Sequence, residues 1–214
     1  MKNELPAVGM KVTAPFRSLK PVFEQWQKLS ASPEWLNAGD APWWYGERAS
    51  LSSFAGAVWL TGVWALEEFG AYKKAVRKGN AKWISGRIDV AFRVGRKRFL
   101  AEAKQYWPRF TKDNADVVIG ELIESLDVAC EDVRKVSERG YTRMGIVFAV
   151  PSIHKAKQEY LDANLSNLIE GLMDRKELTV AYTFPKKARK IKAEKPYHDR
   201  IYPGVILIAR KVGR

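Results

Sequence analysis

The stretch GRIDVAFRVGRKRFLAEAKQ, residues 86–105, has the pattern of a β-hairpin. Apolar and polar residues alternate on both sides of Gly95-Arg96, and a two-residue connection with glycine in its first position is a common hairpin turn. A turn at this place pairs residues that are equally distant from it, so that Phe92 lies opposite Phe99. The sequence therefore predicts two antiparallel strands in a defined register.

Three charged side chains, Asp89, Glu102 and Lys104, lie inside these strands. The same register places Asp89 opposite Glu102, with about 5 Å between the Cβ atoms, and two carboxylates at that distance repel each other. A divalent cation would offset the repulsion, and hard oxygen ligands suit Mg²⁺ or Mn²⁺. Glu102 and Lys104 share a face because side chains repeat every two residues, and a lysine there could activate water or stabilise a phosphate's developing charge. The alternative is a solvated strand face with one ion pair between Lys104 and a carboxylate.

The composition indicates a single domain with a nucleic-acid partner. The chain has 214 residues, 46% of them hydrophobic, and a formal net charge of +13. This length suits one domain with a substantial core, and so large a basic excess favours a polyanion. Cys130 is the only cysteine, which excludes an intrachain disulfide and a cysteine-rich zinc module; we expect it to be a small core residue. His154 and His198 lack any ligand spacing, and no phosphate-cradling glycine loop is present.

The N-terminal residues lack an apolar segment of the signal-peptide type, and no run of 18 apolar residues occurs. We therefore expect a cytoplasmic protein without a membrane partner.

Periodicity predicts an α/β fold with a mixed sheet. Residues 47–61 have a helical stripe made of Leu51, Phe54, Ala55, Val58 and Trp59, and Glu47 stands at the head of this stripe. The other expected elements are helices at 21–29, 116–139 and 154–174, strands at 63–72, 143–151, 178–185 and 204–211, and a basic connection at 73–86 before the hairpin.

The order of Glu47 on a helix, then a strand, then Asp89, then Glu-Ala-Lys at 102–104 resembles the PD-(D/E)XK, or restriction-endonuclease-like, nuclease superfamily. Gly-Glu-Arg at 46–48 is most similar to its Holliday-junction-resolvase and orphan-endonuclease branches. One departure is Ile88, which stands where the name-giving proline would be.

The resemblance covers residues 47–151 and implies an αβββαβ core with a mixed central sheet flanked by helices. Residues 1–46 would be an N-terminal helical, Trp-rich extension, and residues 152–214 would add a helix and strands within the same single domain.

The resemblance also implies roles for individual residues. Asp89 and Glu102 would be metal ligands, joined by the backbone carbonyl of Ala103; Lys104 would be the catalytic lysine; and Glu47 would be an auxiliary acid and further ligand. Glu67 and Glu68 are alternatives for the auxiliary role. Gln105 follows the lysine as in several relatives, although strand alternation turns its side chain away from the catalytic face.

The activity implied is that of a DNA endonuclease that uses one or two Mg²⁺ or Mn²⁺ ions and leaves 5′-phosphate and 3′-hydroxyl ends. Roles in phage defence or restriction, in recombination and repair, and as a mobile-element or toxin nuclease all fit it. An RNA-directed nuclease and a non-catalytic nucleic-acid-binding protein are the alternatives. A homodimer would allow both strands to be cut, but no sequence feature marks an interface or a partner protein.

Phosphate contacts are expected from three basic stretches, at 73–82, 93–98 and 186–195. The candidate residues are Lys73, Lys74, Arg77, Lys78, Arg96, Lys97, Arg98, Lys186, Lys187, Arg189 and Lys190.

Overall fold

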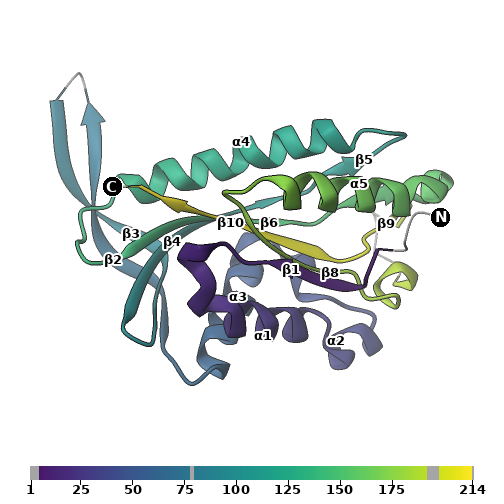
Figure 1. The fold of residues 1–214 in the computed structure, drawn as a ribbon, viewed down its shortest axis with the longest axis horizontal. Coiled ribbons are helices and arrows are strands. Elements are labelled where there is room, and N and C mark those ends of the chain that lie inside the picture. Colours follow the sequence, from purple (N-terminus) through teal and green to yellow (C-terminus); the bar gives the residue numbers. More distant parts are fainter. Residues whose placement is uncertain (1–4, 78–79, 192–197, 214) are drawn as a thin grey trace.

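A seven-stranded mixed sheet with helices on both faces forms the body of the protein (Figure 1). This architecture confirms the expected α/β class. The computed structural model describes residues 5–77, 80–191 and 198–213, and for 75–77, 80 and 81 it describes the backbone alone.

The helices are α1 (Lys20–Ser30), α2 (Pro33–Asn37), α3 (Glu47–Leu60), α4 (Ala115–Arg134) and α5 (Leu161–Asp174), with 3₁₀ turns η1 (Ala14–Leu19), η2 (Pro42–Tyr45), η3 (Lys155–Tyr160) and η4 (Ala188–Lys190). The strands are β1 (Val8–Lys11), β2 (Ala65–Arg77), β3 (Asn80–Val94), β4 (Lys97–Tyr106), β5 (Arg109–Phe110), β6 (Thr142–Ala149), β7 (Ser152–His154), β8 (Thr179–Thr183), β9 (Arg200–Ile201) and β10 (Val205–Val212).

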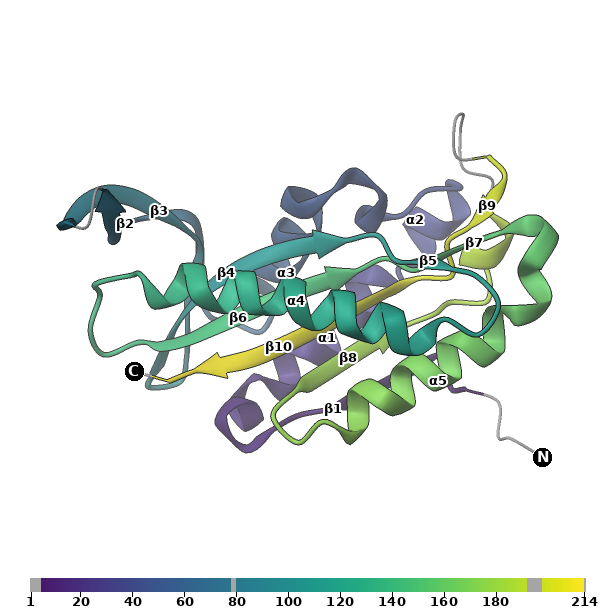
Figure 2. The ribbon, with the colours of Figure 1, turned by 90° about the horizontal axis from the view of Figure 1, so that it is seen from above.

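The large sheet has the order β1-β8-β10-β6-β4-β3-β2. The pair β4–β6 is parallel, and its other described pairs are antiparallel. Helices α4 and α5 cover one face, and α1 and α3 cover the other (Figures 1 and 2). Strands β5, β7 and β9 form a small second sheet. Along the chain, the elements from α3 to β6 follow the order helix, three strands, helix, strand, with the short β5 before the second helix.

Helix α3 forms where the apolar stripe predicts it, and its apolar face packs on the hairpin. Phe54 meets Phe92 edge-on, with 5.5 Å between the ring centroids, and Phe92 stacks on Phe99 at 5.0 Å. Trp59 is an exception to the predicted stripe, because it lies on the last turn of the helix and is 55% exposed. None of the helices in the described ranges is long and apolar enough to cross a membrane.

The predicted hairpin register is confirmed. Gly95 has φ +57°, a backbone conformation that glycine adopts without strain, and the pairs include Phe92 with Phe99 and Val90 with Ala101. The β3–β4 ladder ends at the Val90–Ala101 pair, so that Asp89 and Glu102 are not partners in it.

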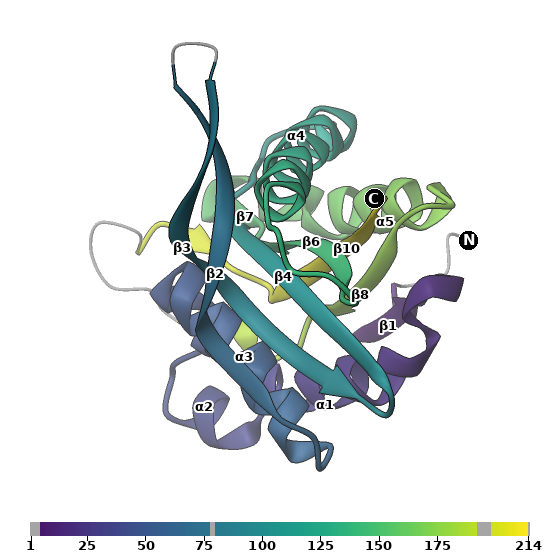
Figure 3. The same ribbon diagram turned by 90° about the vertical axis from the view of Figure 1, so that its left-hand side faces the viewer.

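The prediction of a basic connection at 73–86 is wrong, because residues 73–77 continue β2 and residues 80–86 belong to β3. The two strands extend beyond the body as a ribbon, in which Tyr72 pairs with Ser85 and Lys74 with Trp83 (Figures 1 and 3). We call residues 72–77 and 80–85 the β2–β3 arm. A basic, glycine-containing sequence predicts a loop when it is considered alone, whereas each strand of the arm takes its hydrogen bonds from the other.

Helix α4 ends at Arg134, five residues before the predicted boundary. The following backbone pairs with β2 instead: Lys74 N–H donates to Lys135 O at 2.8 Å, and Ser137 N–H donates to Tyr72 O at 2.9 Å. The helix expected from residue 154 likewise begins only at Leu161, because β7 and η3 precede it.

Helix α4 lies unusually close to β6 at Gly145. An added Cβ there would lie 2.6 Å from Cys130 Sγ and 2.9 Å from Cys130 N. Cys130 itself is buried, as expected of a core residue.

Gly145→Ala should therefore lower the free energy of unfolding by about 1–3 kcal/mol, because α4 would have to move away from the sheet. Urea denaturation measures this. Gly120→Ala is the matched control on α4, where nothing lies within 4 Å of an added Cβ. That change should raise stability by about 0.5–1 kcal/mol. Equal effects of the two substitutions would contradict this close packing.

Candidate active site

Strand β3 leaves its neighbour β4 at Asp89. Strands β2 and β3 pair in the same register before and after Asp89, with Glu67 opposite Val90 and Phe69 opposite Ile88. Glu68 and Asp89 lie between these pairs but are not paired, and Glu68 has φ +52°. That left-handed conformation is uncommon and costly for a residue with a side chain, and such strain concentrates at functional sites.

The break also reverses the alternation of β3 side chains between the two faces of the sheet. Val90 and Phe92 pack in the core beneath α1 and α3, whereas Ile88 packs in the core beneath α4 and α5. Simple alternation, which places Ile88 on the face of Val90, is therefore wrong across Asp89.

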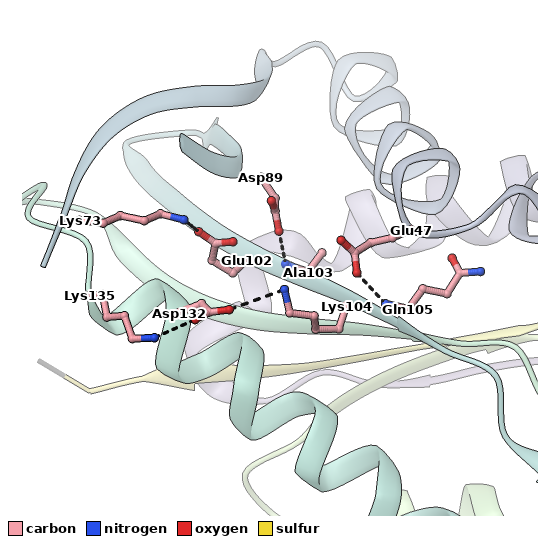
Figure 4. Close-up of polar contacts among 9 residues, drawn as sticks. All are labelled: Glu47, Lys73, Asp89, Glu102, Ala103, Lys104, Gln105, Asp132 and Lys135. Carbon is pink, nitrogen blue, oxygen red and sulfur yellow. Dashed lines mark hydrogen bonds and ion pairs between the residues drawn. The ribbon is translucent and has the colours of Figure 1, made fainter. Parts of the chain in front are cut away.

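Two carboxylates occupy the edge of β4 that β3 leaves open (Figure 4). Asp89 Oδ2 accepts a hydrogen bond from Ala103 N–H at 2.7 Å, and Glu47 Oε2 accepts one from Gln105 N–H at 3.1 Å. Because Ala101 pairs with β3, the backbone groups of residues 103 and 105 point to this same edge. Asp89 and Glu47 are therefore neighbours along one strand edge.

Gln105 holds the start of α3 against β4. Its side-chain amide donates to Trp43 O at 3.0 Å, and its carbonyl accepts from Ser50 Oγ at 2.7 Å. These bonds agree with the expectation that Gln105 turns away from the face of Glu102, and they position the helix turn that carries Glu47. Sequence reasoning missed this positioning role.

Glu102 is a buried acid, with 3% of its surface exposed, and Lys73 Nζ lies 2.5 Å from its Oε1. The pKa of Glu102 is raised to about 7, chiefly because burial disfavours the charged carboxylate. The hydrogen bond from Lys73 lowers this pKa, while the neighbouring carboxyl group of Asp89 raises it. The carboxyl group of Asp89 is thus close enough to raise the pKa of Glu102, although the two residues are not the ladder pair that the hairpin register predicts.

Lys73, expected only as a phosphate contact, reaches across the sheet to Glu102. Its stem passes over Gly86, where an added Cβ would lie 3.3 Å from Lys73 Cδ. A glycine inside a strand often marks a close approach of this kind, which is the one sequence signal that could have identified the contact.

Lys104 lies near the site but its amine is directed to α4. Its Nζ is 3.6 Å from Oδ2 of Asp132, and Lys135 Nζ donates to the other oxygen of Asp132 at 3.0 Å (Figure 4). Asp132 was not among the expected residues, because its helical position gives no hint that it faces the end of β4.

Of the three candidates for the auxiliary acid, Glu47 is the one on the β4 edge beside Asp89. Glu67 accepts a hydrogen bond from Ser52 at 2.8 Å. Glu68 pairs with Arg48 at 2.8 Å and with Arg87 at 3.2 Å.

The three basic stretches lie in different places. The β2–β3 arm, which carries Lys73 and Lys74, borders the carboxylates; Lys78 and the side chain of Arg77 fall outside the described residues. Arg96, Lys97 and Arg98 are at the hairpin turn, and Arg98 lies over the ring of Tyr141 at 4.7 Å. Lys186, Lys187, Arg189 and Lys190 lie in or beside η4, where Lys187 bonds Asn37 and Arg189 pairs with Asp162.

The donor chemistry around Asp89 and Glu102 suits a small hard cation. The two carboxylates are neighbours in a partly buried site. The carbonyl of Ala103 points to the same strand edge as its N–H, which donates to Asp89. A cationic group, Lys73, already compensates the buried acid. In the described part of the chain, no group of three or more His, Cys, Asp or Glu side chains could hold a metal ion. A metal here would therefore need the backbone carbonyl and water as further ligands.

In comparisons with protein-family models, curated proteins and solved structures, none matches the chain. A function is therefore inferred from the residues and from the geometry of the site.

The raised pKa of Glu102 predicts how the stability of the metal-free protein depends on pH. The folded state keeps a proton up to about pH 7, whereas the unfolded state releases it near 4.5. The stabilising contribution of Glu102 is therefore complete below pH 4.5 and is lost as the pH rises through 7. The loss should be on the order of 3 kcal/mol, since one pKa unit corresponds to about 1.4 kcal/mol.

Urea denaturation in EDTA between pH 4.5 and 8 measures this effect. Glu102→Gln should remove the wild-type loss of stability across this range, whatever its absolute stability, because an amide does not titrate. Glu67→Gln, at an exposed position of β2, should keep the wild-type profile. An unchanged profile in Glu102→Gln would contradict the raised pKa.

Proposed function

We propose that the chain is a metal-dependent phosphodiesterase that cleaves DNA. The observation that carries this proposal is the meeting of Asp89 and Glu102 where β3 leaves β4, with Glu47 on the same strand edge. The resemblance to the PD-(D/E)XK superfamily supports it, because these residues are the ones that the motif selects. The net charge of +13 supports a nucleic-acid substrate.

The proposed ligands of Mg²⁺ or Mn²⁺ are Asp89, Glu102 and the carbonyl oxygen of Ala103. When bound, the ion would stabilise negative charge on the phosphate and lower the pKa of a water molecule. The Lys73 ammonium offsets the combined negative charge of the two acids before substrate binds.

The other side chains would orient water and phosphate. Oε2 of Glu47 is bound by the N–H of Gln105, so Oε1 is the atom that would accept a hydrogen bond from the attacking water. Lys104 would exchange Asp132 for an oxygen of the scissile phosphate, since a pair at 3.6 Å between partly exposed groups is weak. Its ammonium would then stabilise the charge that develops on that phosphate.

A nucleic-acid-binding protein without turnover is the second candidate. It is favoured by the pairing of Lys104 with Asp132 and by the absence, among the described residues, of a group of three or more His, Cys, Asp or Glu side chains that could hold a metal ion.

Cleavage of plasmid, single-stranded and branched DNA and of RNA, with and without Mg²⁺ or Mn²⁺, separates the two candidates. The wild type should cut DNA only when a divalent ion is present. Asp89→Asn and Glu102→Gln should each reduce the rate by about 100-fold or more, because each removes a charge that the transition state requires. Lys104→Ala should have a similar effect.

Glu67→Gln is the matched control, because it neutralises a nearby glutamate on β2 without touching the two acids. It should cleave at the wild-type rate. Binding without cutting by the wild type on every substrate would favour the second candidate, and cutting confined to RNA would exclude the DNA assignment.

A further inference from the structure

The β2–β3 arm concentrates positive charge. Between Gly70 and Arg87 the sequence has five lysines and arginines and no acidic residue. Lys74 and Lys82 are exposed, and neither forms an ion pair with a described residue. A surface with this charge is complementary to a polyanion.

The same arm exposes large apolar side chains between its cations. Tyr72 is 60% exposed, Trp83 is 52% exposed and Ile84 is 48% exposed. Trp83 is paired with Lys74 across the ribbon, and Tyr72 is two residues before Lys74, so all three share one face. An arrangement of aromatic rings and cations on one face can bind successive bases and phosphates of a strand.

The base of the arm is fixed to the candidate site. Lys73 bonds Glu102, and backbone hydrogen bonds tie Tyr72 and Lys74 to the segment after α4. Trp83 lies six positions before Asp89 on the same strand, a distance of about 20 Å along extended chain. A nucleic acid whose phosphate lay at Asp89 would therefore pass along the arm over several nucleotides.

We propose that the β2–β3 arm binds an unpaired DNA strand next to the scissile phosphate, with Trp83 and Tyr72 stacking on bases and Lys74 contacting a phosphate. The identity of the nucleic acid rests on the proposed function. Unpaired bases are favoured over a duplex because a duplex presents phosphates to the lysines but keeps the faces of its bases covered.

Fluorescence anisotropy with labelled oligonucleotides in EDTA tests the arm without cleavage. The probes are a single strand, a blunt duplex of the same sequence and a single strand of RNA. Trp83→Ala should weaken single-strand DNA binding by about tenfold and leave duplex binding unchanged, whereas Trp83→Phe should keep most of the affinity. Lys74→Ala should reduce the slope of log affinity against log salt by about 0.7 for the single strand.

Trp59→Ala is the matched control, because Trp59 is similarly exposed at 55% but lies at the end of α3. It should bind all probes as the wild type does. The inference is overturned if Trp83→Ala binds the single strand as tightly as the wild type does, or if its affinities for the single strand and the duplex fall equally. Tighter, Trp83-dependent binding of RNA would overturn the choice of DNA.

The outcome is separable from that of the cleavage experiment. If Asp89→Asn abolishes cutting while Trp83→Ala binds normally, the arm inference alone fails. If the arm variants behave as expected but the wild type cuts no substrate, the proposed function alone fails.

Discussion

Two hydrogen bonds, donated by backbone N–H groups to carboxylate oxygens, maintain the gap between β3 and β4. Once β3 leaves at Asp89, the N–H groups of Ala103 and Gln105 have no strand beside them. A buried N–H without a partner costs about 1–3 kcal/mol, so a side-chain acceptor is needed at each position. Asp89 and Glu47 supply them, and bonds to charged acceptors are the stronger kind. The divergence of the strands and the presence of acids along this edge thus depend on each other.

The clustered acids place negative charge in a partly buried site, and lysines on neighbouring elements compensate it. Glu102 is buried beside Asp89, and the cost of its charge is visible in its raised pKa. Lys73 crosses from β2 to compensate it, which is possible because Gly86 leaves room for the lysine stem. On the side of α4, Asp132 balances two lysines. The site is therefore a set of opposite charges assembled from β2, β3, β4, α3 and α4, in which a divalent cation or a phosphate could replace an internal partner.

The same divergence frees β2 and β3 to extend as an arm. Beyond Asp89 the two strands no longer pair with β4, and their outer edge is supported by the backbone of residues 135–137. The left-handed conformation of Glu68 lies opposite Asp89, where the sheet changes course. One break in the ladder thus places the carboxylates and directs a basic, aromatic surface away from the body, so that a site and its proposed strand-binding surface share a single structural origin.

The sequence by itself determined the elements whose patterns are local: the hairpin register through Gly95 and helix α3 through its apolar spacing. Tertiary structure alone decided the break at Asp89, the arm in place of a loop, the contact of Lys73 with Glu102 and the turn of Lys104 towards Asp132. The physical reason is the distance along the chain over which each effect acts. Strand alternation and turn chemistry act over a few residues, whereas the path of a long lysine side chain and the point where two strands part depend on segments distant in the chain. Ile88 shows the limit, since alternation is valid up to Val90 and reverses across the one residue where the ladder opens.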